Sequence, residues 1–562
     1  MSGVIFHDND FTEKVKMLFR RVESIAEFVS LLNYIDEKVN NPSDRRKKIT
    51  VKSLCYINRD RDKWYTVFNI PKKNGKNRLI TAPKSYLKYI QSLINILLQI
   101  VFYDKVHYNT NGFIINRGIV RNATPHVGKR YLLSVDIKDF FPSIQFRRIK
   151  TVLSLGPFYL IGSKEKLAFF IANFCTYKGV LPQGAPTSPI LSNIVTQKLD
   201  RRISQLCHER KIKYSRYADD LSFSSNQNVF DNDFIAKITK IVIDEGFSIN
   251  DEKTRIRCSG ERQEVTGIVV NRKLNVSKVF LKKVRAILYN WNIKGIDYTQ
   301  NKFLKHYKPN KGNIKFQEVL WGYISFIGLV RGRNDKLFTD LFYKYLFLKN
   351  QIDYSCISNE EVRKRLINDN NKMEELYGKY ILSKEDLFID FCTAAFHQIE
   401  NLLYYYYWKR FPDICDLSEY LYHNNPEVQK KFKKGIHYYG KIGDIQINNL
   451  VYLFEKEFYF DMKIPYNQEI TFLRNARNDH SHRCFLTRLD VPQIKKDYNE
   501  ILEYGKEYFK KNKKNRPLTE TEKKTKSDHR FILFMEQHDY NDVRQRLKDV
   551  INKIKSYPGI EL

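Results

Sequence analysis

The feature that most constrains this 562-residue chain is a pair of adjacent carboxylates, Asp219 and Asp220, within the otherwise apolar and small segment Tyr217–Ser224. The flanks, Lys213–Tyr217 and Leu221–Ser225, alternate as strands do, which predicts that the pair occupies the tight turn of a β-hairpin. Two adjacent like charges repel and destabilise a fold unless a cation neutralises them. Carboxylate oxygens suit Mg²⁺, and two such ions can stabilise an in-line phosphoryl displacement. The alternative is an ordinary acidic turn.

A third carboxylate, Asp136, ends another strand-like segment. Tyr131–Ile137 is typical of a short buried strand, and Lys138–Ile144 ends it in a turn. A carboxylate at a strand end beside a carboxylate pair in a hairpin is the arrangement that two metal ions need. Between these segments, the Pro and Gly of Leu181–Pro189 predict a rigid turn, and Ile190–Leu199 then follows helical spacing.

Five sequence blocks occur in the order found in reverse transcriptases, and the chain resembles that family. The blocks are Arg78–Pro83, Ser134–Phe141, Leu181–Gly184, Tyr217–Asp220, and Gly246–Asn250 with Lys253. Two further elements resemble the bacterial retron branch: an NAxxH element at Asn122–His126 and a VTG element at Val265–Gly267. The resemblance covers about residues 1–350. It implies an α+β right-hand polymerase with fingers, palm and helical thumb, followed here by an all-α C-terminal domain.

The family resemblance implies roles for single residues. Asp136, Asp219 and Asp220 would be the catalytic ligands of two Mg²⁺ ions. Phe141 would be the steric gate that excludes a 2′-hydroxyl, with an ordinary core aromatic as the alternative. The other substrate-binding residues would be Gln183 and Gly184 in the nucleotide pocket, Arg78 and Lys76 on the triphosphate, and Lys253. For Arg78 a solvated loop charge is the alternative.

RNA contacts follow from the same resemblance and from charge. The expected RNA-binding residues are Asn122, His126, Val265, Thr266 and Gly267, with a basic thumb at Lys282, Lys283, Arg331 and Arg333. Lys and Arg number 97 against 63 Asp and Glu, a formal net charge of +34 that attracts polyanions. Aromatics make up 14% of the chain and offer faces for base stacking. Such charge also suits a membrane surface, but without a long apolar span or secretory pattern we expect a cytoplasmic protein and no membrane partner.

The character of the chain changes after about residue 350. We expect fingers and palm over 1–275, a thumb over 276–350, a linker over 351–384, a helical domain over 385–515, and a basic connector with a last helix over 516–562. The polar run Asp369–Lys372 suggests a break, and Thr519–Lys526 suggests a mobile connector. One helical stripe is formed by Phe388, Phe391, Ala395, Ile399 and Leu402.

The C-terminal half contains a second chemical candidate. Phe472–His482 resembles the RNxxxH element of HEPN domains, an all-helical family rich in metal-independent ribonucleases. The resemblance assigns catalysis to Arg477 and His482 beside Asn478, with Arg474 and His480 as a rival pair and Glu400 as the acidic partner. His can move a proton and Arg can stabilise phosphate charge without a metal. In a regular helix positions 477 and 482 lie about 140° apart, whereas 474, 478 and 482 share one face. RNA binding without cleavage, or helix capping, is the alternative.

Taken together, these resemblances imply a retron reverse transcriptase with a HEPN-like ribonuclease toxin used in antiviral defence. Its partners would be dNTPs, a cognate structured non-coding RNA, the branched 2′-primed single-stranded DNA product (msDNA), a host RNase H, and a second copy bound through the C-terminal domain. The alternative is another bacterial defence or intron-type reverse transcriptase whose C-terminal domain is a non-catalytic binding or assembly module.

Overall fold

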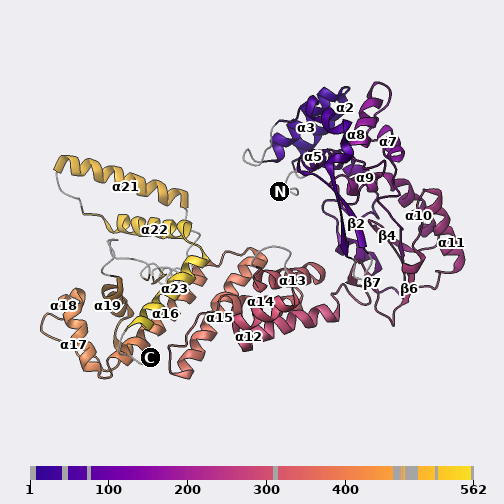
Figure 1. Ribbon diagram of the computed structural model, residues 1–562. Helices are drawn as coiled ribbons and strands as arrows, with labels where there is room; N and C mark the ends of the chain where they lie inside the picture. The colour runs from indigo at the N-terminus through magenta and orange to yellow at the C-terminus, as the bar shows by residue number, and fades with distance from the viewer. Residues whose placement is uncertain are drawn as a thin grey trace. The chain divides into compact units, whose positions relative to one another are not determined.

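The computed structural model describes residues 8–40, 48–71, 77–307, 314–459, 470, 473–474, 491–512 and 517–557 (Figure 1). The chain separates into two compact units: unit 1 comprises 1–283 with 325–332, and unit 2 comprises 284–324 with 333–562. Each unit has its own hydrophobic core. Most of the thumb expected over 276–350 therefore belongs to the same unit as the C-terminal helices.

Unit 1 is built around an antiparallel sheet of four strands in the order β4-β5-β3-β6. Two separate hairpins, β1-β2 and β7-β8, accompany it. The strands are β1 (Tyr65–Pro71), β2 (Asn77–Pro83), β3 (Tyr131–Asp136), β4 (Lys213–Tyr217), β5 (Asp220–Ser225), β6 (Arg255–Cys258), β7 (Glu264–Val265) and β8 (Ile268–Val269). The predicted strand Tyr131–Ile137 and the predicted hairpin around Asp219 are confirmed by β3, β4 and β5.

Helices surround this sheet. They are α2 (Asn9–Arg21), α3 (Ile25–Val39), α4 (Val51–Arg59), α5 (Ser85–Phe102), α6 (Ile119–Ala123), α7 (Phe146–Ser154), α8 (Glu165–Phe174), α9 (Ser188–Val195), α10 (Gln197–Glu209) and α11 (Asn232–Asp244). Short 3₁₀ helices are η1 (Arg61–Trp64), η2 (Tyr103–Lys105), η3 (Thr124–His126), η4 (Gly162–Lys164) and η5 (Asp251–Lys253).

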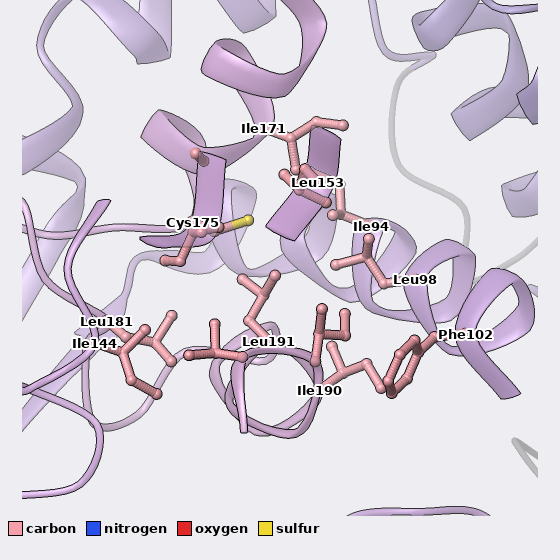
Figure 2. Packing of buried hydrophobic residues seen from close by; sticks show 14 of the residues in the cluster. Ile94, Leu98, Phe102, Ile144, Leu153, Ile171, Cys175, Leu181, Ile190 and Leu191 are labelled. Carbon is pink, nitrogen blue, oxygen red and sulfur yellow. The ribbon is translucent and has the colours of Figure 1, made fainter. Parts of the chain in front are cut away.

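The core of unit 1 lies where α5 meets the helices that follow the β3 turn. Figure 2 shows Ile94, Leu98 and Phe102 of α5 near Ile190 and Leu191 of α9, and all five are buried. Within the described residues, one segment, Ser85–Lys105, is long and apolar enough to cross a membrane, and 50% of its most apolar window is buried. This segment consists of α5 and η2, and the apolar face of α5 forms part of this core.

The helix expected over Ile190–Leu199 is interrupted. α9 ends at Val195 and α10 begins at Gln197, with Thr196 between them at φ −86° and ψ 4°. The hydroxyl of Thr196 donates to the Ser192 carbonyl oxygen at 2.8 Å. Such back-bonding competes with the backbone ladder and bends helices, which explains a break that apolar spacing alone does not reveal.

Every element described between residues 284 and 557 is helical. Helices α12 (Lys278–His306) and α13 (Phe316–Arg331) contribute to both units. The others are α14 (Lys336–Lys349), α15 (Glu360–Ser383), α16 (Phe388–Arg410), α17 (Ile414–Asn424), α18 (Pro426–Lys431), η6 (Ile442–Asp444), α19 (Ile447–Tyr459), α21 (Val491–Asn512), α22 (Glu520–Gln537) and α23 (Tyr540–Ser556). The stripe predicted from Phe388 to Leu402 is confirmed, since all five of its residues are buried in α16.

The expected linker over 351–384 contains α15 instead, and the polar run Asp369–Lys372 does not break it. Leu366 and Met373 are buried, and α15 packs along α16. The buried Glu374 accepts hydrogen bonds from Arg544 of α23, at 2.7 Å from Nη2 to Oε2. Tertiary packing and a buried ion pair thus outweigh the weak helix propensity of consecutive Asn residues.

The connector expected over Thr519–Lys526 is also helical. Thr519 and Glu522 form a reciprocal cap, with the Glu522 amide donating to the Thr519 hydroxyl at 3.2 Å and the Thr519 amide donating to Glu522 at 2.9 Å. This pattern is a capping box, a helix-start signal that the charge run obscured. α22 lies beside α21 (Figure 1), and the ring centroids of Tyr498 on α21 and His529 on α22 lie 3.7 Å apart in a stacked arrangement.

Candidate active site

The two neighbouring carboxylates lie where the sheet ends. Tyr217 ends β4, Asp220 begins β5, and Ala218 has a φ of 56° in the turn between them. Asp220 pairs in register with Asp136, the last residue of β3. The backbone amide of Ile137 also donates to the Asp219 carbonyl oxygen at 3.0 Å. Antiparallel pairing therefore brings the three predicted catalytic aspartates to one edge of the sheet.

A buried ion pair supports the turn between β4 and β5. Arg216 and Asp200 have side chains with 0% exposure, and Arg216 Nη2 lies 2.6 Å from Asp200 Oδ2. Arg216 Nη1 donates to the Ala218 carbonyl oxygen at 3.0 Å, so the guanidinium holds the turn directly. The Tyr214 hydroxyl and the Thr110 hydroxyl each donate to Asp200 at 2.7 Å. Although burial opposes it, the charge of Arg216 lowers the pKa of Asp200.

Sequence reasoning missed this pair, but a signal was present. Asp200 lies on the buried face of α10 with Leu199, Ile203 and Cys207, where an unpaired charge would be costly. Arg216 follows the buried residues Tyr214 and Ser215 in β4 and is itself buried, which poses the same problem. Buried charges of opposite sign are normally paired, so the two could have been matched from the pattern.

A glycine lets a second segment approach the turn. A Cβ added at Gly112 would lie 2.6 Å from the Ala218 backbone nitrogen, closer than side chains tolerate. Asn193 donates to the Gly112 carbonyl oxygen at 2.8 Å and accepts from Arg216 at 3.2 Å. The turn is therefore held by backbone contact on one side and by the Arg216 network on the other.

The charges at this edge interact strongly. Lys253 Nζ lies 2.8 Å and 3.0 Å from the two carboxylate oxygens of Asp136, and Asn250 donates to the same carboxylate at 3.2 Å. Partial burial and the charge of Asp136 raise the pKa of Asp219, while Lys253 and Arg78 oppose the rise. Desolvation, followed by repulsion from Asp219 and Asp136, raises the pKa of Asp220 to about 6.

This arrangement fits divalent cations in its donor chemistry. Within the described ranges, no three His, Cys, Asp or Glu side chains are grouped closely enough to surround one ion as they stand. The Asp136 carboxylate is instead paired with Lys253. Burial and, after it, the neighbouring carboxylates raise the pKa values of Asp219 and Asp220, and a hard cation would relieve the repulsion among the carboxylates. Asp136 would have to exchange its ammonium partner for the ion.

The predicted substrate-binding residues Arg78, Gln183 and Gly184 lie on β2 and on the loop that is hydrogen-bonded to β2. Arg78 is exposed on β2, close enough for its charge to act on Asp219. The Thr81 amide of β2 donates to the Gln183 carbonyl oxygen at 2.8 Å. Gly184 has a φ of 134°, and an added Cβ would lie 3.0 Å from the Thr81 oxygen, so glycine is required there. Lys76 lies outside the described residues.

Phe141 is half-buried rather than enclosed in the core. Its ring centroid lies 5.5 Å from that of Phe140 and 6.4 Å from that of the exposed Phe113. It follows Asp136 by five positions, in the turn that leaves β3. This position is compatible with a gate that meets the sugar, and the assignment stays a prediction.

The structure corrects two of the predicted RNA contacts. Asn122 and His126 both have 0% exposure, so their side chains cannot reach RNA. The His126 ring nitrogens lie 2.7 Å from the Ser224 hydroxyl and 2.8 Å from the Ser215 hydroxyl, and burial lowers the His126 pKa to about 3. His126 therefore cross-links β4 and β5, and the Asn122 carbonyl oxygen accepts from Ser215 at 3.0 Å.

The VTG element contains one buried residue and two turn residues. Val265 is buried in β7, whereas Thr266 and the exposed Gly267 form the β7–β8 turn with φ values of 47° and 81°. Of the expected thumb contacts, Lys282 and Lys283 are exposed at the start of α12. Arg331 donates to Asn275 at 2.6 Å, and Arg333 is exposed. The residues that remain available to RNA are thus turn and helix-surface residues.

Most of the C-terminal candidate site, Arg477, Asn478, His480 and His482, lies outside the described residues. Arg474 is half-buried, and burial lowers its pKa although Glu455 and Glu427 oppose the change. Glu400 lies on α16 with its Oε2 atom 3.4 Å from His397 Nδ1. The two carboxylates near Arg474 favour a role for that residue within the protein over phosphate binding.

Comparison with known proteins identifies the family to which the chain belongs. Residues 70–304 match the family model described as reverse transcriptase (RNA-dependent DNA polymerase). The retron Ec86 reverse transcriptase of Escherichia coli is 33% identical over 264 residues, which cover 45% of this chain and 78% of that protein. The chain belongs to the retron-type reverse transcriptases.

Two Myxococcus xanthus proteins are also similar. The retron Mx65 reverse transcriptase is 38% identical over 41% of this chain and 57% of its own length, and the retron Mx162 enzyme is 34% identical over 40% and 52%. The chain thus spans little more than half of each. Candida albicans telomerase, solved with a fragment of telomeric RNA, overlaps 54% of this chain and 66% of its own at 11% identity, with a TM-score of 0.32 that supports no argument.

Replacing Asp220 by Asn should stabilise the protein in a pH-dependent way. Because the folded pKa of Asp220 is raised to about 6, folding takes up protons, and wild-type stability falls as pH rises from about 4 to about 6. The melting temperature of Asp220→Asn relative to wild type should therefore rise over that window and level off above it. The exposed carboxylate variant Asp10→Asn is the matched control. A difference independent of pH would contradict the electrostatic assignment.

Proposed function

We propose that this protein is an RNA-directed DNA polymerase that copies a structured RNA into DNA. The observation that carries the proposal is the convergence of Asp136, Asp219 and Asp220 at one sheet edge, where burial and, after it, the neighbouring carboxylates raise the pKa values of Asp219 and Asp220. Membership of the retron-type reverse transcriptases supports the same activity. Two Mg²⁺ ions, when bound, would stabilise the attacking and leaving oxygens of phosphoryl transfer.

The remaining residues position the substrates. Arg78 on β2 would bind the triphosphate of a dNTP, because a guanidinium and phosphate oxygens form charge-assisted bonds. The backbone contact between Thr81 and Gln183 would align β2 with the nucleotide pocket. Lys253, which holds Asp136 at 2.8 Å, would be displaced toward the phosphates as the carboxylate takes up its ion. Phe141 would exclude the 2′-hydroxyl.

We propose more specifically that the polymerase is part of a retron system. The template would be a cognate structured non-coding RNA, the product would be msDNA primed from an internal 2′-hydroxyl, and a host RNase H would remove copied template in the cytoplasm. The net charge of +34 supports the binding of a polyanion such as this RNA. Shape and phosphates dominate recognition of RNA helices, so stem-loops would be bound through exposed lysines such as Lys282 and Lys283.

Substitution of a single site carboxylate should abolish DNA synthesis. Asp219→Asn or Asp136→Asn each removes one anionic ligand, and primer extension should fall more than about a hundredfold, the scale of losing one group that stabilises transition-state charge. RNA binding, measured by anisotropy, should be unchanged. The control Asp10→Asn should extend normally. Full extension by either site variant would refute the assignment.

Phe141→Ala should admit ribonucleotides. The ring that would meet a 2′-hydroxyl is removed, so the ratio of rNTP to dNTP incorporation should rise by at least about tenfold, corresponding to relief of a modest steric penalty. Phe140→Leu, which changes the buried neighbour, serves as the packing control. If discrimination is the same in Phe141→Ala as in wild type, Phe141 contributes to packing alone.

We further propose that the C-terminal helices form a HEPN-like ribonuclease that acts as an antiviral toxin. The described elements of unit 2, all of which are helical, and the spacing of Arg477, Asn478 and His482 in the sequence support it. The msDNA complex would restrain this activity, and self-association through the domain would complete the site. The competing function, a non-catalytic assembly module, uses the same helices without chemistry.

Ribonuclease activity should persist without divalent metal. Purified full-length protein carrying Asp219→Asn should cleave single-stranded RNA in EDTA, and His482→Ala or Arg477→Ala should reduce the rate by about a hundredfold or more. Arg474→Ala and His480→Ala test the rival pair in parallel. Cleavage that survives all four changes would come from another source, and the absence of cleavage in every protein would favour the assembly module.

A further inference from the structure

A basic cavity of about 460 Å³ lies in unit 1, built from residues separate from the aspartate edge. It is formed by α7, by the α9–α10 junction and by the residue that follows α11. Four cations line it: Arg147, Arg148, Lys198 and Arg201. Glu245 is the one carboxylate among the described residues that line it.

The carboxylate of Glu245 is already neutralised. Arg202 Nη1 lies 2.9 Å from it and Lys198 Nζ lies 3.3 Å from it. None of Arg147, Arg148 and Arg201 forms an ion pair with a described residue, and Arg147 and Arg201 are exposed. Their guanidinium donors therefore face solvent or a ligand, and an anion in the cavity would reduce the repulsion among these like charges.

Arg148 shows the imbalance most clearly. Its Nη1 atom is buried and has no hydrogen-bond acceptor among the described residues, although a buried donor without a partner is costly. Its guanidinium lies 4.6 Å from the centroid of the Phe247 ring, a cation–π contact that helps to hold it in place. Burial lowers the pKa of Arg148, and the charge of Glu245 only partly opposes this. A pre-oriented guanidinium of this kind suits phosphate oxygens.

We propose that this cavity is a phosphate-binding site in which Arg147, Arg148 and Arg201 hold the anion. Gln197 and Thr151 also line the cavity and can donate hydrogen bonds to the remaining oxygens. The phosphate belongs either to the backbone of a single-stranded nucleic acid or to a free polyphosphate, because both present the same oxygens. The site is distinct from the triphosphate position assigned to Arg78.

Binding can be measured without any catalysis. The full-length chain carrying Asp219→Asn serves as the parent, so a failure here would leave the polymerase proposal untouched. The test variant adds Arg147→Ala and Arg201→Ala, which are exposed, and the matched control adds Lys166→Ala and Lys240→Ala, which are exposed cations of unit 1 outside the cavity. One probe is pyrophosphate in calorimetry, and the other is a fluorescent 20-nucleotide oligothymidylate, a single-stranded DNA that the proposed ribonuclease does not cleave, in anisotropy over a series of KCl concentrations.

The two probes separate the two sources. If the occupant is nucleic acid, the test variant should lower the slope of log affinity against log salt by about 1.4, the value for two lost contacts to a single strand. If the occupant is a free polyphosphate, pyrophosphate affinity should fall at least about tenfold, as loss of charge-assisted hydrogen bonds predicts. In either case the control variant should follow the parent.

Equal behaviour of the test and control variants with both probes would overturn the proposal. Arg148→Lys supplies a second check, because it keeps the charge and removes the planar fork. Its circular dichroism and melting temperature report folding, and a folded Arg148→Lys protein that binds both probes as tightly as the parent would also count against the site.

Discussion

The candidate active site depends on the buried pair of Arg216 and Asp200. One guanidinium binds a carboxylate from α10 and the carbonyl oxygen of Ala218, and so fixes the turn that carries Asp219 and Asp220. Removing one member of a fully buried pair typically costs about 3–5 kcal/mol, because the other charge is left without a partner. The same pair organises Tyr214, Thr110 and Asn193. Because the Arg216–Asp200 pair fixes this turn, the fold keeps Asp219 and Asp220 side by side despite the repulsion between their carboxylates.

The support explains how the site can store repulsion. Asp219 and Asp220 would relax apart in a flexible turn, but backbone pairing to β3 and the close approach at Gly112 prevent this. Burial and the neighbouring carboxylates together raise the pKa values of Asp219 and Asp220. Lys253 relieves part of the repulsion at Asp136. The fold therefore holds the carboxylates in an arrangement that favours cation binding, and the ammonium group of Lys253 pairs with one of them, Asp136.

The polymerase half was largely predictable because its signals are local. Alternation around Asp219 and the apolar run before Asp136 predicted the strands that meet, and helical spacing predicted the stripe from Phe388 to Leu402 in the C-terminal half. Interactions between distant segments were not predictable in this way. The burial of His126 depends on Ser215 and Ser224, about ninety positions away, and α15 is held by Arg544. Composition also misled at Thr519–Lys526, where a capping box outweighed a charged run.

The cross-link made by His126 has a consequence for experiments on acidity. Its two ring nitrogens are both occupied by serine hydroxyls on neighbouring strands, and burial holds its pKa near 3. A neutral imidazole has one donor and one acceptor nitrogen, so one serine must give a proton and the other must receive one. The ring therefore links the two strands through hydrogen bonds of fixed direction, and it stays neutral throughout the pH range in which histidines normally titrate. An inflection near neutrality in a rate profile could not be attributed to this imidazole, although it is the histidine nearest in sequence to β3.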